Sequence, residues 1–374
     1  MDPEDVTGCF FREQALLLAA SGYHIGVLVF KGVPIRSLRD CWLWPGRARV
    51  VVDHEVATWR VEHVSGVRGY ERIVMPHVVA SWFRRYIRLN GIPDVLHAHA
   101  AFPAGCYARR LSRTFHIPYV VTEHGTAYQR GTFSQKCLQK VRGIFADANM
   151  SIAVSTDLAR FLNANVCPEK EFCVIPNPLS SRFEHSDIAT IAGNRSETRC
   201  TFLNVGLTTP KKGQGILIQA FSKAFRGSDT RLCIIGDGVS LPDLQALASR
   251  EGVGDQVIFK GRLPNRQVLH EMQTCDVVVV SSLCETFGVV LIEALACGKP
   301  VVSTACGGPE DIVNSANGYL VAPGSVDQLA QAMQRMHDDR HRFDPWRIRE
   351  DCVARFGGQS VVRKLSQVYN AVLS

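Results

Sequence analysis

Two glutamates eight residues apart form the strongest chemical signal in the sequence. Glu285 follows the apolar segment Asp276–Val280, and Glu293 lies among the apolar side chains of a segment that we expect to be helical. A carboxylate inside so apolar a helix needs a partner, because burial of an unpaired charge is costly. Between the two glutamates, Thr286-Phe287-Gly288 would present main-chain N–H groups at a helix N-terminus, which favours a phosphate group. Carboxylates beside such a site suit sugar hydroxyl groups, which need acceptors.

A glycine and two lysines form a second group, directly after the apolar run Thr201–Val205. Gly206 lets a ligand approach the main chain, and Lys212 carries the charge to pair with a diphosphate. Alone this group is weakly diagnostic, because lysines at helix starts are usually just solvated. The chain has no P-loop pattern, and Gly236-Asp237-Gly238 lacks the third glycine of a dinucleotide fingerprint. We therefore expect neither ATP hydrolysis nor a dehydrogenase.

Three histidines follow strand candidates in the first half of the chain. His124 comes after Tyr119–Thr122, and His97 and His99 come at the end of the apolar run that starts at Val95. A histidine pair binds metal in some proteins, but no third ligand is evident here. We expect His97 and His99 to be structural or to line an acceptor site, and we expect no metal site.

Short apolar runs alternate with amphipathic stretches, which is typical of an α/β fold. Continuous runs such as Val277–Val280 indicate parallel strands that are covered on both faces. The polar stretch Ser180–Thr198 separates two series of strands, so we predict doubly wound, Rossmann-like domains at 1–180 and 181–345, with a helix at 346–374 crossing back to the first domain. The predicted strands are Ile25–Phe30, Val95–His97, Tyr119–Thr122, Ser151–Val154, Cys173–Ile175, Thr201–Val205, Arg231–Ile235, Val257–Lys260, Asp276–Val280 and Pro300–Ser303.

Composition limits the class of protein. The chain has 374 residues, of which 46% are hydrophobic and 21% are charged, and this fits two folded domains rather than a disordered chain. No apolar run reaches the roughly 18 residues of a membrane-spanning helix. Residues 1–5 are acidic where a signal peptide would be basic. We therefore expect a soluble, cytoplasmic protein with reduced cysteines.

The net charge of +7 is concentrated in the first half of the chain. Residues 1–180 contain 21 Lys and Arg against 15 Asp and Glu, whereas residues 181–374 contain 21 against 20. The segment Trp82–Leu89 mixes aromatic and basic residues, as an interfacial helix does. An ordinary solvated surface and a face that meets anionic lipid or a phosphorylated substrate both fit this charge. Nucleic acid is not an expected partner, since no recognised binding motif accompanies the charge.

Taken in this order, the motifs resemble those of the retaining GT-B glycosyltransferases of family 4, also called group 1 glycosyltransferases. The resemblance runs from about Gly8 to the C-terminal helix and is densest at 201–325. It includes the two glutamates, and it continues through Ala294–Val302, Cys306–Glu310 and Asn317–Val321. It implies that two Rossmann-like domains face each other across a cleft. The N-terminal domain would bind the acceptor, and the C-terminal domain would bind a nucleotide-activated sugar.

The resemblance also implies roles for the matching residues of the second domain. Glu285 would contact the hydroxyl groups of the donor sugar, Glu293 would hold the ribose, and Lys212 would neutralise the leaving diphosphate. Leu263 stands where the main chain of the family meets the base. The main-chain amides that bind the sugar and diphosphate would come from Phe287, Gly288 and Val289.

In the first domain, His124 matches the histidine that the family places near the reacting sugar, and it is therefore a second catalytic candidate. Gly8 would belong to the glycine loop of the family, on the acceptor side together with His97 and His99. Residues 1–7 are acidic and contain a proline where the family has its first strand. We therefore expect the first N-terminal strand to be missing.

A second departure from the family pattern concerns the diphosphate. Leu207 occupies the position of an arginine that pairs with the family's lysine on the diphosphate. Loss of one of two cations weakens stabilisation of the leaving group in the transition state. We expect Lys211 to compensate by binding the donor.

We therefore expect a retaining hexosyltransferase that moves a sugar from a nucleotide-diphosphate donor to a glycan or lipid-linked acceptor in polysaccharide or glycolipid assembly. The resemblance implies no metal and no other cofactor, and a phosphate oxygen of the donor would take the acceptor proton. The basic half adds an expected peripheral contact with the anionic inner membrane face. A non-hydrolysing nucleotide-sugar epimerase shares the architecture but needs an acid–base set that is not evident. A degenerate protein that binds nucleotide sugar without transfer is the third alternative.

Overall fold

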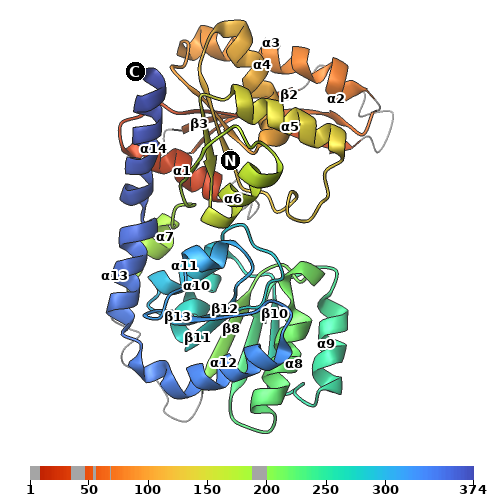
Figure 1. Cartoon of the computed structure of the whole chain (residues 1–374), viewed down its shortest axis with the longest axis vertical. Coiled ribbons are helices and arrows are strands. Elements are labelled where there is room, and N and C mark those ends of the chain that lie inside the picture. Colours follow the sequence, from red (N-terminus) through yellow and green to blue (C-terminus); the bar gives the residue numbers. More distant parts are fainter. Residues whose placement is uncertain (1–8, 35–46, 54–55, 68, 188–199) are drawn as a thin grey trace.

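The computed structural model describes residues 9–34, 47–53, 56–67, 69–187 and 200–374. The chain forms two lobes stacked along the long axis of the molecule, with the N-terminal half in the upper lobe of Figure 1. The last two helices run along one side of both lobes, so that the C-terminus lies beside the upper one. Strands alternate with helices from β4 (Leu96–His99) onward through most of the chain, which confirms the predicted α/β class.

The lower lobe contains a six-stranded sheet in the order β10-β9-β8-β11-β12-β13. Every neighbouring pair in it is parallel. All residues of β11 and β12 are buried, because helices cover both faces of the sheet. The four valines of β11 are the continuous apolar run expected of such a strand. The strands are β8 (Thr201–Val205), β9 (Arg231–Ile235), β10 (Val257–Gly261), β11 (Val277–Val280), β12 (Val301–Thr304) and β13 (Gly318–Val321).

The upper lobe contains a parallel four-stranded sheet, β4-β5-β6-β7, and a three-stranded sheet, β1-β3-β2, in which only β2 is antiparallel. Within the described part of the chain no strand precedes the first helix, and β1 is not paired with β4. The expectation of a missing first strand falls on residues 1–8, which lie outside the described residues. The strands are β1 (Gly26–Pro34), β2 (Arg47–Asp53), β3 (Val56–Ser65), β4 (Leu96–His99), β5 (Tyr119–Glu123), β6 (Met150–Ala153) and β7 (Phe172–Val174).

Helices connect the strands and cover the sheets (Figure 1). Short helical turns also lie at the carboxyl ends of strands: η2 (Ala101–Gly105), η4 (Pro210–Lys212) and η5 (Gly308–Asp311). The α-helices are α1 (Cys9–Ala20), α2 (Tyr70–Ile73), α3 (Met75–Asn90), α4 (Cys106–Phe115), α5 (Gln135–Asp147), α6 (Thr156–Asn165), α7 (Ser181–Glu184), α8 (Gln214–Phe225), α9 (Leu241–Arg250), α10 (Asn265–Thr274), α11 (Val289–Ala296), α12 (Val326–Asp339), α13 (Pro345–Phe356) and α14 (Gly358–Leu373).

The last helix belongs to the packing of the upper lobe. Val361 and Leu365 of α14 are buried in one apolar cluster with Val120 of β5 and Ile152 of β6. Tyr369, one turn further along α14, reaches β4, where its hydroxyl is hydrogen-bonded to Nδ1 of His97 at 2.7 Å. The chain therefore leaves the lower lobe through α13 and returns to the N-terminal sheet through α14.

The strand predictions fit best in the lower lobe. Thr201–Val205 and Arg231–Ile235 are confirmed with the same bounds, and the other predicted strands differ at their ends by one to four residues. In the predicted linker, α7 begins at Ser181 and buries Phe183, while residues 188–199 lie outside the described residues. The eleven cysteines with described side chains are free thiols. None of the described helices has the length and apolar character needed to cross a membrane.

Candidate active site

A cavity of about 220 Å³ lies at the point where the strand order of the lower sheet reverses, between β8 and β11. The two strands pair only at Val277 with Phe202 and Val278 with Leu203. Connections leave such a pair in opposite directions, so a crevice forms beyond the carboxyl ends of the strands. The lower lobe supplies most of the lining, and the upper lobe contributes Phe10, His124 and Asn177. The cavity is thus shared by both lobes.

Many of the predicted site residues meet in this cavity. Its lining includes the two predicted catalytic side chains of the lower lobe, the predicted histidine and the helix-terminus segment: Lys212, Glu285, His124, Phe287, Gly288 and Val289. The other predicted residues lie outside its lining: Gly206, Lys211, Leu263, Glu293, His97 and His99. Gly8 lies outside the described residues.

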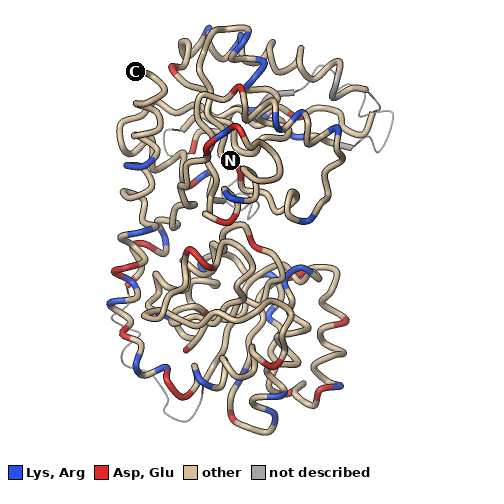
Figure 2. Tube along the Cα trace, in the orientation of Figure 1, with Lys and Arg blue, Asp and Glu red and all other residues tan. Residues whose placement is uncertain are grey.

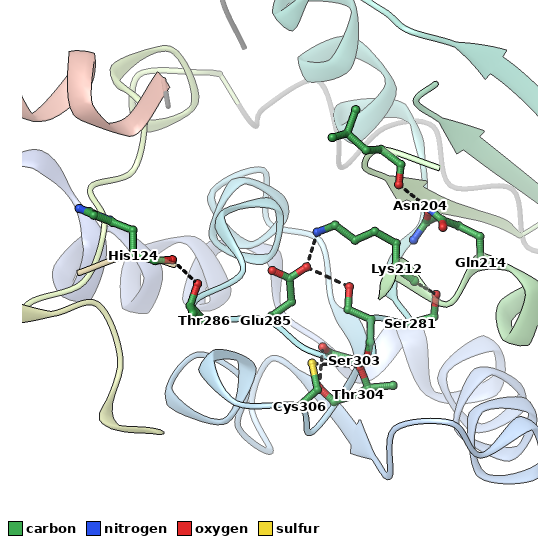
Figure 3. Close-up of polar contacts among 12 residues, drawn as sticks. His124, Asn204, Lys212, Gln214, Ser281, Glu285, Thr286, Ser303, Thr304 and Cys306 are labelled. Carbon is green, nitrogen blue, oxygen red and sulfur yellow. Dashed lines mark hydrogen bonds and ion pairs between the residues drawn. The ribbon is translucent and has the colours of Figure 1, made fainter. Parts of the chain in front are cut away.

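Lys212 and Glu285 form an ion pair inside the cavity (Figure 3). Ser282 donates its hydroxyl hydrogen to the same Oε1 atom of Glu285 at 2.9 Å. The main chain of Glu285 is held on both sides, because its N–H donates to Cys306 and its carbonyl accepts from Gly308. The side chains are only 22% and 12% exposed. The site thus places a cation suited to phosphate beside a carboxylate suited to hydroxyl groups.

The helix α11 begins at the cavity with a glycine in the left-handed conformation. Gly288 has a φ of 104°, which L side chains rarely adopt, and it precedes the first helical residue, Val289. The side chain of Phe287 is 2% exposed and packs against Phe356 at 5.8 Å between ring centroids. On the other side, Gly308 packs directly against the main chain of Phe287, where a Cβ would lie 2.2 Å from the Phe287 Cα. The loop is therefore anchored while its N–H groups stay at the cavity, as anion binding requires.

Glu293 lies one turn into α11 and is partly buried. Burial raises its pKa to about 8, and the nearby carboxylate of Glu13 adds to the rise. The carboxyl group is then largely protonated at neutral pH, so it has an O–H donor as well as an acceptor. Such a group suits a hydroxyl ligand better than an anion.

The three predicted histidines lie together at the ends of β4 and β5. The Nδ1 atom of His99 and the Nε2 atom of His124 are 3.2 Å apart. The ring nitrogens of His97 bond to the hydroxyls of Tyr369 and Thr122, each at 2.7 Å. Burial lowers the pKa of all three imidazoles, that of His99 to about 4. The cluster is therefore uncharged at neutral pH, and His124 is its member at the cavity.

Two amide side chains in the cavity wall were not predicted. Asn204 of β8 and Gln214 of α8 are 4% and 2% exposed, and each donates its NH₂ group to a main-chain carbonyl, Val279 and Leu207 respectively. The Oδ1 and Oε1 atoms accept no hydrogen bond. Buried acceptors without a donor are uncommon and need an explanation. A polar residue inside the apolar run Thr201–Val205 was the available signal for Asn204.

Leu207, where the resemblance implies an arginine, is 63% exposed. The neighbouring Lys211 is partly buried, and its carbonyl accepts a hydrogen bond from the N–H of Leu283 at 2.8 Å. Leu263 is partly buried against the apolar core of the lower lobe. Within the described part of the chain, no group of three or more His, Cys, Asp and Glu side chains is arranged to hold a metal ion.

Two family models match the chain, one for each lobe. Residues 11–182 match the model described as Glycosyltransferase Family 4, and residues 189–352 match the model described as Glycosyl transferases group 1.

Curated relatives match along most of the chain. An N-acetyl-alpha-D-glucosaminyl L-malate synthase of Bacillus anthracis is 28% identical over 288 residues, which is 75% of each chain. A putative teichuronic acid biosynthesis glycosyltransferase of Bacillus subtilis is 26% identical and covers 89% of this chain and 85% of its own.

Solved structures share the fold. A sucrose-phosphate synthase from Thermosynechococcus elongatus superposes with a TM-score of 0.79 at 22% identity, over 97% of this chain and 92% of its own. The Anabaena protein HepE, in complex with UDP and glucose, gives 0.75 at 20% identity, over 98% and 97% of the two chains. The two Rossmann-like lobes thus form a GT-B fold, and the chain belongs to the group 1 glycosyltransferases of family 4.

Proposed function

We propose that this glycosyltransferase moves a hexose from a nucleotide-diphosphate sugar to a glycan or lipid-linked acceptor, with retention of the anomeric configuration. The observation that carries the proposal is the cavity at the sheet's switch point. There Lys212 and Glu285 face each other beside the N-terminus of α11. A diphosphate suits the cation and the helix end, and sugar hydroxyls suit the carboxylate. The protonated carboxyl of Glu293 is our candidate for holding the ribose.

The donor is the better supported of the two substrates. HepE was crystallised with UDP and glucose, and the B. anthracis and B. subtilis relatives are named for glycosyl transfer. We therefore take uracil-based donors as the first to test. Binding would require the Lys212–Glu285 ion pair to open, since the two side chains now satisfy each other. The donor's diphosphate and hydroxyl groups would replace those contacts.

The transfer step that we propose uses the donor itself as base. The bond between the anomeric carbon and the diphosphate oxygen breaks, the acceptor oxygen bonds to the same face of that carbon, and a diphosphate oxygen takes the acceptor proton. Lys212 and the N–H groups at Gly288 would stabilise the charge on the leaving group. His124, held neutral by burial, would position the sugar rather than carry charge. We propose no metal and no further cofactor.

A nucleotide-sugar-binding protein without transfer is the second candidate, and Leu207 favours it. This side chain is exposed and uncharged where the family has its second diphosphate cation. Lys211, next to Lys212 on η4, is our candidate for supplying the missing charge. The two functions differ in one respect, since only the transferase releases nucleoside diphosphate when an acceptor is present.

The acceptor side is proposed to meet anionic membrane lipid. Arg84, Arg85 and Arg88 are exposed on α3, which contains no acidic residue, and Leu89 beside them is 67% exposed. Figure 2 shows blue segments over the part of the upper lobe that contains α3 and α4. Basic residues with exposed apolar neighbours bind anionic bilayers. Loss of salt-sensitive sedimentation with phosphatidylglycerol vesicles in the triple Arg→Glu variant is the expected result, and absence of binding by the unaltered protein contradicts this part of the proposal.

A two-stage experiment tests the proposed function. The protein is first screened for thermal stabilisation by UDP-glucose, UDP-N-acetylglucosamine, UDP-galactose and GDP-mannose, because a bound donor stabilises the folded state by mass action. The best donor is then radiolabelled and incubated with membrane lipid extracts and glycan acceptors. Transfer of label supports the transferase. Stabilisation without transfer or nucleotide release, across all acceptors, supports the binding protein instead.

A further inference from the structure

A buried carboxylate with four hydrogen-bond donors lies directly next to the histidine of the cavity. Glu123 is the last residue of β5 and is 2% exposed. Its Oε1 atom accepts from the main-chain N–H groups of His124 and Gly125 at 2.8 and 2.9 Å. Its Oε2 atom accepts from the main-chain N–H of Ala101 at 2.9 Å and from the hydroxyl of Tyr128 at 2.8 Å. Both oxygens are therefore fully used within the upper lobe.

These four bonds fix two strand ends at once. His124 follows β5, and Ala101 follows β4, whose last residue is His99. Ala100, which lies between His99 and Ala101, has a φ of 73°, and this angle is strained for a residue with a side chain. Its N–H donates to the carbonyl of Thr122 at 2.7 Å, and the bond from Ala101 to Glu123 holds the next peptide. Strain of this kind persists only where the surroundings enforce it.

The same turn reaches the donor side of the cavity. The carbonyl of His124 accepts a hydrogen bond from the hydroxyl of Thr286 at 2.7 Å (Figure 3). Thr286 directly precedes Phe287 and Gly288, the segment at the N-terminus of α11. Displacement of the His124 main chain would therefore change both its imidazole and the contact between the lobes.

We propose that Glu123 is a positioning residue of the transfer reaction, which acts through His124. Glu123 does not line the cavity, whereas His124 does. Glu123 would therefore act by orienting His124 and not by contacting the substrate. It sets the His99–His124 pair and the bond that the Thr286 hydroxyl donates to the His124 carbonyl. A carboxylate is more costly to bury than an apolar side chain. Its presence here is explained by its four bonds, which fix the ends of the two strands that carry the histidines. The effect on catalysis rests on the proposed function, whereas the effect on geometry does not.

The first test is kinetic, with UDP-glucose or whichever donor the screen selects. Glu123→Gln keeps the shape but turns one accepting oxygen into a donor that faces other donors. We expect kcat to fall by about 10- to 100-fold, as for loss of a partner that orients a reacting group, with the donor KM within about threefold. Tyr128→Phe, which leaves the Oε1 bonds intact, should lower kcat by less than about threefold. Glu169→Gln, which alters an exposed carboxylate paired with Arg142, should leave kcat unchanged.

The second test needs no activity. Amide hydrogen exchange should accelerate at His124, Gly125 and Ala101 in Glu123→Gln and remain unchanged in strands of the lower lobe. The imidazole pKa values of His99 and His124, followed by NMR, should rise toward the ordinary value as the turn loosens. If the unaltered protein transfers no sugar, the proposed function fails while these two readouts still decide the geometry.

Opposite results would overturn the proposal. Unchanged exchange at the three amides shows that Glu123 does not hold the turn. An unchanged kcat, or a donor KM that rises as much as kcat falls, excludes a positioning role in the transfer step. If Glu123→Gln does not fold, Glu123→Asp replaces it, with an intermediate kcat expected because the shorter carboxylate cannot reach all four donors. Failure of both to fold rejects a positioning role in favour of a folding requirement.

Discussion

Thr286 of the lower lobe donates its hydroxyl hydrogen to the main-chain carbonyl of His124 in the upper lobe, at 2.7 Å. Both residues line the cavity, and Thr286 is 7% exposed. The bond ties the turn after β5 to the segment before α11, so the two halves of the site are joined at the point where a donor sugar is proposed to react.

Removal of this bond should weaken catalysis moderately. Thr286→Val preserves the shape but leaves the His124 carbonyl without its donor, and a hydrogen bond of this type contributes about 0.5–1.5 kcal/mol. We expect kcat/KM to fall by about three- to tenfold. Thr286→Ser keeps the hydroxyl and serves as the matched control. Equal kinetics in the two variants would show that the bond between the lobes is not used in turnover.

The two lysines of η4 should both matter for turnover. Lys212→Ala should lower kcat by about 100-fold or more, because one preorganised charge on a leaving group is commonly that large a factor. Lys211→Ala should lower it by about tenfold if Lys211 replaces the arginine absent at position 207. Lys223→Ala, on the exposed side of α8, is the control. An unchanged Lys211 variant removes the idea of compensation.

The raised pKa of Glu293 predicts a stability that depends on pH. The unfolded carboxyl titrates near 4.5 and the folded one near 8, so between these values the folded state binds more protons. The stabilisation from this group is therefore fully present below pH 4.5 and is lost as pH rises toward 8, by about 5 kcal/mol in all. Thermal melts at pH 5 to 8.5 should show a decline that Glu293→Gln reduces. Glu169→Gln should keep the decline, and a flat profile for the unaltered protein contradicts the assignment.

The unpartnered oxygen of Gln214 predicts a ligand contact. Gln214→Leu removes a buried acceptor at the cavity while keeping a similar volume. A hydroxyl group that pairs with it would contribute about 1 kcal/mol or more to binding. We expect the KM for the donor to rise about fivefold, whereas Gln219→Leu on the same helix leaves it unchanged. An unaltered donor KM in Gln214→Leu, with normal thermal stability, shows that this oxygen meets no ligand.

The sequence predicted most strands of the lower lobe well because they are short runs dominated by apolar residues, and the central ones, β8, β9, β11 and β12, are largely buried. It missed β3, since Val56–Ser65 interleaves Thr, Arg, Glu and His with apolar residues and is covered unevenly along its length. It placed Gly318–Val321 in a motif but did not identify it as a strand. Short, mixed strands depend on the sheet around them, which local patterns do not contain.

The site shows the same division. Lys212 and Glu285 follow strands β8 and β11, so the doubly wound topology alone brings them to one crevice. Asn204, Gln214 and the four bonds of Glu123 were not foreseen, because they depend on side-chain directions and on partners 22 to 75 residues away in several cases. The count of charged residues is enough to show that the N-terminal half is basic. Which face of α3 is exposed follows only from the structure, in which Val79 and Phe83 pack into the core.

The anomeric configuration of the product decides whether this cavity transfers sugar with retention. The direct measurement is NMR of the product from the first turnovers with the selected donor. The one-bond coupling between C1 and H1 and the coupling between H1 and H2 report the configuration of the anomeric carbon. We expect a product with the donor's own anomeric configuration, and we expect Glu285→Gln to form none. A product of inverted configuration, or equal product formation by Glu285→Gln, would contradict this expectation.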